Sequence, residues 1–235
     1  MRVPRPPTAW VATLSTSWSG SAREAILREL KRVILDGAAA PGLPIPVDEV
    51  AARYQVSRIP VREALMSLVG EGLVEHRSRA GYTVATLTPG ELREFYLVRE
   101  ALEAAALGAA VRRATAADDA LVSQAHAATS EAIRAGDSRG HHRESRRFHL
   151  ALVNAGGMPR LARMFESAWN MTEPARPMDY ASRDAVDLLN DDHERMLHAF
   201  RARDAAALLE VSRLHHGRLQ NFVLALPESG ELGQG

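Results

Sequence analysis

Residues 56–65 read VSRIPVREAL, and this stretch decides the fold of the N-terminal part of the chain. Apolar side chains recur there, and just beyond, at the spacing of a helix with one buried face. They are Val61, Ala64, Leu65, Leu68 and Val69. Pro60 stands in the first turn, where its missing N–H breaks no hydrogen bond. The pattern predicts a helix over 57–70, with Arg58 and Arg62 four residues apart on its outer face.

The segments on either side of this helix complete a recognisable order. Two shorter helix patterns precede it, over 21–36 and 47–54, and two strand patterns follow it, over 73–77 and 82–85. The order helix, helix, tight turn, helix and two-stranded wing is that of a winged helix-turn-helix, which places one helix in the DNA major groove. We therefore expect a DNA-binding domain over 21–86.

The residues at the start of the central helix suit DNA recognition. The planar guanidinium of Arg58 or Arg62 can bond guanine O6 and N7 or clamp a phosphate. Ser57, at the helix N-terminus, can bind a phosphate or can act only as a helix cap. Arg79 and Gly81 give the wing a basic, flexible tip. The alternative partners of the two arginines are the acidic residues Asp48, Glu49 and Glu63.

Three motifs, VSRIPVREAL at 56–65, EGLV at 71–74 and GYTV at 81–84, closely resemble the DNA-binding domain of the GntR family of bacterial transcription regulators. In that family the two arginines at the helix start read bases, and the wing tip touches the minor groove. An arginine that many relatives carry early in the second helix aligns with Asp48, so one family contact is absent. The resemblance implies a homodimer on a short inverted repeat of double-stranded DNA. It assigns DNA contacts to Ser57, Arg58, Ile59, Pro60, Arg62, Arg79 and Gly81.

The rest of the chain is predicted to be helical throughout. Six helix patterns follow, with no strand signal between them, over 90–114, 117–135, 138–155, 158–170, 182–202 and 204–225. The predicted fold class is mainly α, a winged helix-turn-helix followed by an antiparallel bundle of six to seven helices over 90–226. The segments 1–20 and 227–235 lack periodicity and are expected to be disordered tails.

Composition excludes several classes of protein. The net charge is zero, with 29 basic and 29 acidic residues, but residues 1–86 carry a basic excess that suits a phosphate-bearing partner. The chain has no cysteine, so disulfides, thiolate metal sites and a cysteine nucleophile are excluded. No apolar run approaches the roughly 20 residues of a membrane helix, and the N-terminus lacks the apolar core of a secretory signal. A cytoplasmic protein with no membrane partner is expected.

Three histidines of the helical part, His149, His193 and His215, belong to three different predicted helices. Neutral imidazoles that converge inside a bundle can bind Zn²⁺ or a similar divalent ion. Residues 92–224 are similar to the all-helical ligand-binding domain called FCD, found in the FadR subfamily of GntR regulators. The matching marks are Arg99-x-x-x-Glu103, Phe148-His149, His193-x-x-Met196-x-x-Ala199 leading to Asp204, and His215.

This second resemblance implies a metal held by an aspartate and three histidines. The histidines carry over to His149, His193 and His215, whereas Ser145 stands where the aspartate is expected. Zinc is the first candidate, with nickel or another divalent ion as alternatives. A small carboxylate metabolite, clamped by Arg99 in a pocket with Ser145, would supply the missing charge.

Other interpretations of these residues stay open. The pocket can work without a metal, and Arg99 can instead pair with Glu103 on an exposed face. His142, His198 and His216 are expected to lie outside the metal site, because they point elsewhere or are too far along their helices.

The predicted function is a DNA-binding transcriptional regulator, a repressor by its family resemblance, that responds to the carboxylate metabolite. The alternative is a metal-dependent hydrolase on a helical scaffold, since three imidazoles with an open position can activate water. The sequence has no His-Glu-x-x-His motif, because Leu197 stands where the second histidine would follow His193-Glu194. We therefore expect that the protein is not an enzyme.

Overall fold

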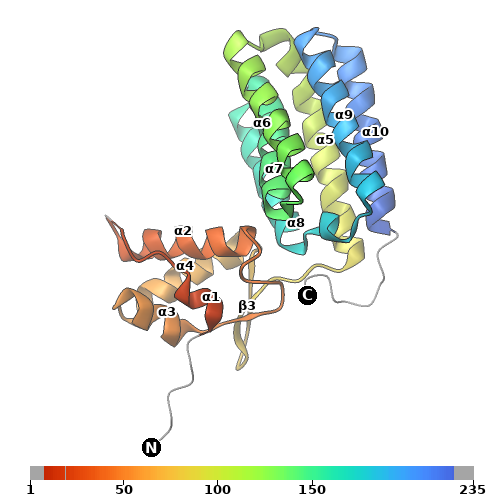
Figure 1. Ribbon diagram of the computed structural model, residues 1–235. Helices are drawn as coiled ribbons and strands as arrows, with labels where there is room; N and C mark the ends of the chain where they lie inside the picture. The colour runs from red at the N-terminus through yellow and green to blue at the C-terminus, as the bar shows by residue number, and fades with distance from the viewer. Residues whose placement is uncertain (1–7, 19, 225–235) are drawn as a thin grey trace, which may run out of the picture. The chain divides into compact units, whose positions relative to one another are not determined.

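The helix predicted over 57–70 is α4, Arg58–Gly70, and it packs against α2, Ala22–Leu35, and α3, Val47–Tyr54. The computed structural model describes residues 8–18 and 20–224, which divide into two units between Thr86 and Leu87 (Figure 1). The apolar stripe of α4 is buried as its spacing predicts, with Val61, Ala64, Leu65 and Leu68 fully inside the core.

A small antiparallel sheet completes the first unit. Its strands are β1, Pro44–Ile45, β2, Val74–Arg77, and β3, Gly81–Val84, in the order β1-β3-β2. The wing hairpin is in register from the pair Val74 and Val84 to the pair Arg77 and Gly81. The sequence predicted the two wing strands but not β1, because a strand of two residues that includes a proline carries no periodicity.

The expectation of a disordered tail over 1–20 is wrong for residues 8–18. This segment contains the short helix α1, Ala9–Ala12, and buries Trp10, Val11 and Leu14 in the core of the first unit. Residues 1–7 and 227–235, the rest of the expected tails, lie outside the described residues together with 19, 225 and 226. The missed signal is the spacing of Trp10, Val11 and Leu14, which places them on one face of a helical turn.

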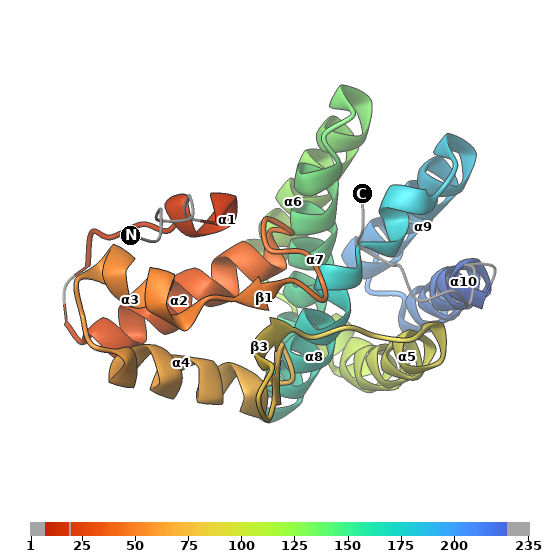
Figure 2. The ribbon, with the colours of Figure 1, turned by 90° about the horizontal axis from the view of Figure 1, so that it is seen from below.

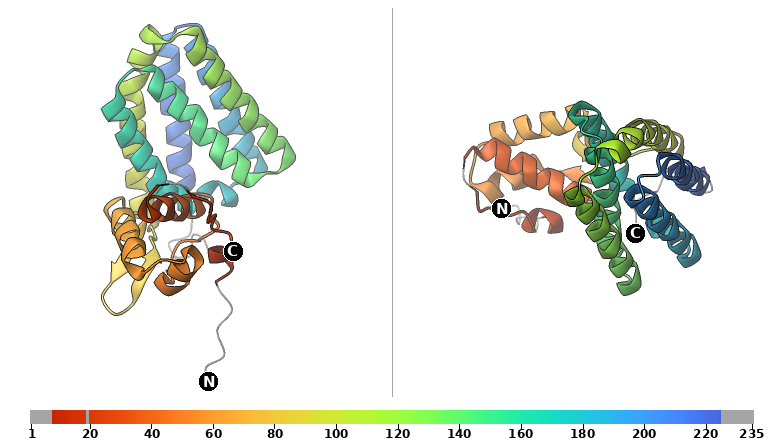
Figure 3. Two further views of the ribbon diagram at one scale, coloured as in Figure 1. Left: turned by 90° about the vertical axis from the view of Figure 1, so that its left-hand side faces the viewer. Right: turned by 90° about the horizontal axis from the view of Figure 1, so that it is seen from above.

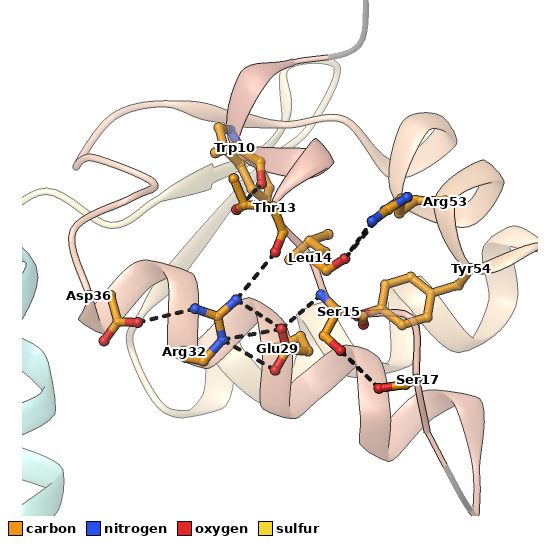
Figure 4. A network of polar contacts seen from close by, with 10 residues as sticks. All are labelled: Trp10, Thr13, Leu14, Ser15, Ser17, Glu29, Arg32, Asp36, Arg53 and Tyr54. Atoms are coloured by element: carbon orange, nitrogen blue, oxygen red, sulfur yellow. Dashed lines mark hydrogen bonds and ion pairs between the residues drawn. The ribbon is translucent and has the colours of Figure 1, made fainter.

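Polar contacts hold this N-terminal segment against α2 and α3 (Figure 4). Arg53 donates to the Leu14 carbonyl at 3.0 Å, and the Tyr54 hydroxyl donates to the Ser15 carbonyl at 2.8 Å. Glu29 accepts from the Ser15 backbone N–H at 3.0 Å. The segment is therefore part of the folded winged helix-turn-helix rather than an appendage to it.

Over the described residues 87–224, the second unit is a bundle of six long α-helices, as predicted (Figures 1 and 3). The helices are α5 Pro89–Arg113, α6 Ala116–Ala135, α7 Ser138–Ala155, α8 Pro159–Thr172, α9 Arg183–Arg201 and α10 Ala205–Leu224. Capping boxes at Thr88 with Glu91 and at Thr115 with Asp118 begin α5 and α6. Two short 3₁₀ helices, Glu173–Ala175 and Pro177–Tyr180, link α8 to α9.

Helix packing brings α5 and α10 into contact with three other helices of the bundle. α5 packs against α10, α8 and α7, and α10 packs against α9; Figure 2 shows α5 and α10 end-on, next to each other. The apolar interior includes the fully buried side chains of Phe148, Phe165 and Phe200. Buried polar side chains are gathered in the same bundle, and they define the candidate site. No helix of the described residues has both the length and the apolar character to span a membrane.

Candidate functional site

The first candidate surface is the N-terminal end of α4. Gln55, with φ of 56°, ends α3 in a left-handed conformation and directs the chain into Ser57, the N-cap of α4. The Ser57 side chain makes no capping hydrogen bond, so its hydroxyl is free to meet a ligand at the helix N-terminus. Because the opposite face of α4 is buried, Arg58 and Arg62 are exposed, and Ile59 beside them is 67% exposed.

The two arginines differ in their partners. Arg58 forms an exposed ion pair with Asp48 at the start of α3, which is one of the alternatives that the sequence left open. Arg62 forms no ion pair among the described residues, so the alternative of an acidic partner is not seen for it there. An exposed pair of this kind contributes about 0–1 kcal/mol, so it leaves the Arg58 guanidinium able to exchange its partner.

The wing tip is shaped by two residues with positive φ. Arg79 has φ of 71° and Gly81 has φ of 88°, and between them they reverse the chain from β2 to β3. Arg79 is exposed at the tip, whereas Arg77 pairs with Glu75 at 2.9 Å on the strand. The predicted surface residues Ser57, Arg58, Ile59, Arg62 and Arg79 are all exposed on the first unit.

The second candidate site lies inside the bundle, where three buried histidines converge. His149 on α7, His193 on α9 and His215 on α10 each offer a ring nitrogen within 4.8 Å of the others. The Nε2 atoms of His149 and His193 are 3.0 Å apart, and the rings of His193 and His215 are 4.7 Å apart between centroids. Burial lowers the pKa of all three imidazoles, for His215 to about 3, so the cluster is neutral at pH 7.

A fully buried carboxylate lies behind this cluster. Glu103 on α5 accepts a hydrogen bond from Nδ1 of His149 at 2.6 Å and from Nε2 of His216 at 2.5 Å. Burial opposes its ionisation, but the contacts with His149 and His216 hold the pKa of Glu103 well below its usual range. The alternative of an exposed pair between Arg99 and Glu103 is wrong, because Glu103 is fully buried beside His149. His216 lies outside the three-histidine group, but it is fully buried and bonded to Glu103, which its position on α10 did not reveal.

Arg99 is buried rather than exposed, which removes the alternative of a solvated pair. Its guanidinium carbon lies 3.3 Å from the Trp169 ring centroid and 4.6 Å from that of Tyr96. One terminal nitrogen donates to Thr172 Oγ1 at 3.2 Å, while Nε is buried without a partner. The arginine therefore presents a positive charge with unused hydrogen-bonding capacity to the interior.

A cavity brings these groups together. Arg99, Ser145, Glu173 and the three histidines His149, His193 and His215 line it. Ser145 contributes to the lining at the predicted place, one helical turn before His149. Trp169 Nε1 donates to Glu173 at 2.5 Å, and burial raises the pKa of that carboxyl group.

Two other histidines of the bundle, His142 and His198, have different surroundings. His142 pairs with Asp179 at 3.2 Å, and His198 is exposed on α9. Both lie outside the three-histidine group, as expected. Sequence reasoning also missed the residues that surround Arg99, because single aromatic and threonine side chains on α5 and α8 carry no motif. These are Tyr96, Trp169 and Thr172.

Comparison with known proteins assigns each of the two units to a known domain. The family described as "Bacterial regulatory proteins, gntR family" matches residues 22–84, and the FCD domain matches residues 94–218. The HTH-type transcriptional repressor GlaR of Escherichia coli is 29% identical over 196 residues, which cover 80% of this chain and 89% of GlaR. The uncharacterized HTH-type transcriptional regulator BphR of Paraburkholderia xenovorans is 27% identical over 198 residues, covering 82% of this chain and 81% of BphR.

Solved structures show the same fold. A putative transcriptional regulator GntR from Rhodococcus sp. RHA1 has a TM-score of 0.79 at 22% identity and covers 88% of this chain and 100% of its own. E. coli McbR/YncC has a TM-score of 0.77 at 24% identity, covering 88% and 98%. The matched families and relatives are regulators, and they give the hydrolase alternative no support. The chain belongs to the GntR family of DNA-binding transcriptional regulators that carry a C-terminal FCD domain.

Proposed function

We propose that this regulator is a repressor whose operator affinity is controlled by a divalent cation and a small carboxylate metabolite bound in the helical domain. The observation that carries the proposal is the convergence of three buried, neutral imidazoles beside a buried arginine. Neutral imidazole is the form that binds metal, and a buried guanidinium with a free N–H is a partner for a carboxylate.

The residues fit a tetrahedral metal site. Two nitrogen ligands of a zinc ion at 2.0–2.1 Å lie about 3.3 Å from each other, close to the 3.0 Å between Nε2 of His149 and Nε2 of His193. Nδ1 of His193 and of His215 are buried without hydrogen-bond partners. His149, His193 and His215 would hold the ion, which when bound supplies a Lewis-acidic position for a carboxylate oxygen. Zinc is our first candidate, and nickel or another divalent ion is the alternative.

Arg99 is the second anchor for the metabolite. Its guanidinium is fixed in orientation by Trp169 and Tyr96, and it borders the same cavity as Ser145. A carboxylate that bridges the cation and Arg99 would satisfy the buried Nε and neutralise a buried positive charge. A polar metabolite without a carboxylate would leave both charges uncompensated.

The DNA-binding unit recognises its operator through α4, which we call the reading helix, and through the wing. In our proposal the base edges are contacted by Arg58 and Arg62. The DNA backbone is approached by Ser57, Ile59 and Pro60. The minor groove receives the wing tip, with Arg79 and Gly81. A homodimer places two such units on an inverted repeat. The metabolite changes operator affinity only to the extent that it binds one conformation of the dimer more tightly than the other.

Two experiments test these assignments separately. The first uses DNA selected by the wild-type protein from a random pool, with Arg58→Ala and Arg62→Ala as variants. Each is expected to lose about 1–3 kcal/mol of the free energy of specific binding. Wild-type affinity in both folded variants would refute the assignment of α4 as the reading helix. The second compares the metal content of tag-free wild-type protein with that of His149→Ala/His193→Ala. Equal content in the two proteins would refute the metal site.

The carboxylate is tested with a panel of small organic acids in a thermal-shift assay on the zinc-loaded protein. Acids that stabilise the wild-type protein are expected to lose that effect in Arg99→Met, because the guanidinium is replaced by an apolar chain of similar length. Stabilisation of equal size in the variant would show that Arg99 is not the anchor.

A further inference from the structure

We propose that Glu103 compensates the charge of the cation held by His149, His193 and His215, acting through His149 from outside the coordination sphere. The inference rests on the proposed metal site and names the residue that replaces an aspartate at position 145. Glu103 is thus a positioning residue, since it touches a ligand of the ion and not the ion itself.

Distances separate this role from direct ligation. Glu103 Oε1 is 2.6 Å from His149 Nδ1, and Oε2 is 2.5 Å from His216 Nε2. Both values are hydrogen-bond distances, and both are shorter than the roughly 3.3 Å between two ligands of one tetrahedral ion. Although Glu103, His149 and His216 also lie within 4.8 Å of one another, their contacts are those of a bonded network.

The contact with Glu103 fixes the state of the His149 ring. Since an ionised carboxylate only accepts, Nδ1 of His149 must carry the proton that it donates to Glu103. The lone pair is therefore on Nε2, which is the atom that faces His193. A carboxylate in this place orients an imidazole ligand and raises its basicity, as second partners of metal-bound histidines do.

Glu103 is itself held in place from α10. Oε2 accepts from His216 and also from Ser212 Oγ at 3.3 Å, so the carboxylate has partners on two helices. The side chain is 0% exposed, and its negative charge is therefore little screened by water. This charge is part of the fold before any ligand binds.

Two other carboxylates near the cluster, Asp192 and Glu173, make their shortest contacts with residues outside it. Asp192 forms an ion pair with Arg218, and its other oxygen is 3.8 Å from His215 Nδ1, beyond hydrogen-bond distance. Glu173 accepts from Trp169 and lies 4.0 Å from His142. Among the residues that the structure describes, Glu103 is the carboxylate hydrogen-bonded to a member of the three-histidine group.

The test measures zinc affinity by competition with a chromogenic chelator at pH 7.5, and site geometry from the visible spectrum of the Co²⁺-substituted protein. Glu103→Gln keeps the shape of the side chain and removes its charge. We expect it to bind zinc about 10–100-fold more weakly. Glu210→Gln is the control, since it neutralises a carboxylate on α10 that is exposed and paired with Arg213, and we expect a change of less than about 3-fold.

Ser145→Asp in the otherwise wild-type protein tests the same claim without disturbing the buried network. If Glu103 already compensates the charge, an added aspartate is expected to raise zinc affinity by less than about 10-fold. A gain of about 100-fold or more would show that the wild-type site lacks compensation and would overturn the proposal, as would wild-type affinity in Glu103→Gln.

A third variant separates the inference from the proposed function beneath it. His149→Ala removes a ligand, and we expect it to abolish the tetrahedral Co²⁺ spectrum. If His149→Ala binds zinc as the wild-type protein does, the metal site itself is wrong. If His149→Ala loses zinc while Glu103→Gln retains it, the site stands and only the role of Glu103 is refuted.

Discussion

Replacement of Asp48 by alanine should tighten DNA binding, and the structure gives the reason. Asp48 lies in the first turn of α3 and forms an ion pair with Arg58 at the start of the reading helix. Both side chains are about two-thirds exposed, so the pair is formed in solvent. In the free protein Asp48 therefore competes with DNA for Arg58, and in the complex its charge repels the phosphates.

The expected size follows from these two effects. Releasing Arg58 from an exposed ion pair is worth about 0.2–1 kcal/mol. Removing a negative charge at about 8 Å from a phosphate is worth roughly 0.5 kcal/mol in water before screening by salt. Together they correspond to binding about 2–10-fold tighter per chain. Asp48→Arg adds a cation at the same place. The slope of log K for DNA binding against the logarithm of the salt concentration should therefore become steeper by about 0.9.

Fluorescence anisotropy with a DNA duplex selected by the wild-type protein, at several salt concentrations, measures both quantities. Glu71→Ala is the control, because it also removes one negative charge from an ion pair, with Lys31 at 2.7 Å. Glu71 follows α4 and is 13 residues from Arg58, about 20 Å along the helix. We expect no more than a small change for this control. Equal or weaker binding by Asp48→Ala, or the same gain in Glu71→Ala, would refute the reasoning.

Three further predictions concern stability. Leu14→Ala should destabilise the N-terminal unit by about 2–5 kcal/mol in chemical denaturation, because Leu14 is 0% exposed, whereas Trp18→Ala at 40% exposure should stay within about 0.5 kcal/mol. Burial, with a smaller effect of His142, lowers the pKa of His141 to about 4, so the folded state binds fewer protons than the unfolded state between pH 6.5 and 4. Wild-type stability should therefore fall relative to His141→Gln as the pH drops through that window, by up to about 3 kcal/mol, and parallel pH profiles would contradict this. Zinc at 100 times its dissociation constant should stabilise the bundle by about 2.7 kcal/mol, and chelation should reverse the gain; a gain of the same size in His149→Ala/His193→Ala would contradict the site.

The reading helix was predictable because its signal is local. The spacing of its buried residues orients α4, and that orientation alone exposes Arg58 and Arg62. The same reasoning predicted the six helices of the bundle to within a few residues, since glycine, proline and capping residues mark their ends. The segment 8–18 was missed because three prolines before it and its own scattered serines and threonines made the whole stretch 1–20 resemble a tail.

The interior of the bundle was less predictable, because the direction of a side chain depends on how many neighbours a helix has. His215 and His216 are consecutive and lie about 100° apart around α10, which suggests that only one faces inward. Both are buried because α10 packs against α5 and α9 at once. Glu103 is hidden in the same way on α5, which contacts three other helices of the bundle. Periodicity does not distinguish such a helix from one with a solvated charged face.

Anomalous diffraction at the zinc edge, from crystals of tag-free protein purified without added metal, tests the account's central claim most directly. We expect one peak within 2.0–2.1 Å of a ring nitrogen from each of His149, His193 and His215, with Glu103 still bonded to His149 Nδ1 and outside the coordination sphere. A cavity without an anomalous peak, in which His149 and His193 bond each other directly even after soaking with zinc, would contradict it.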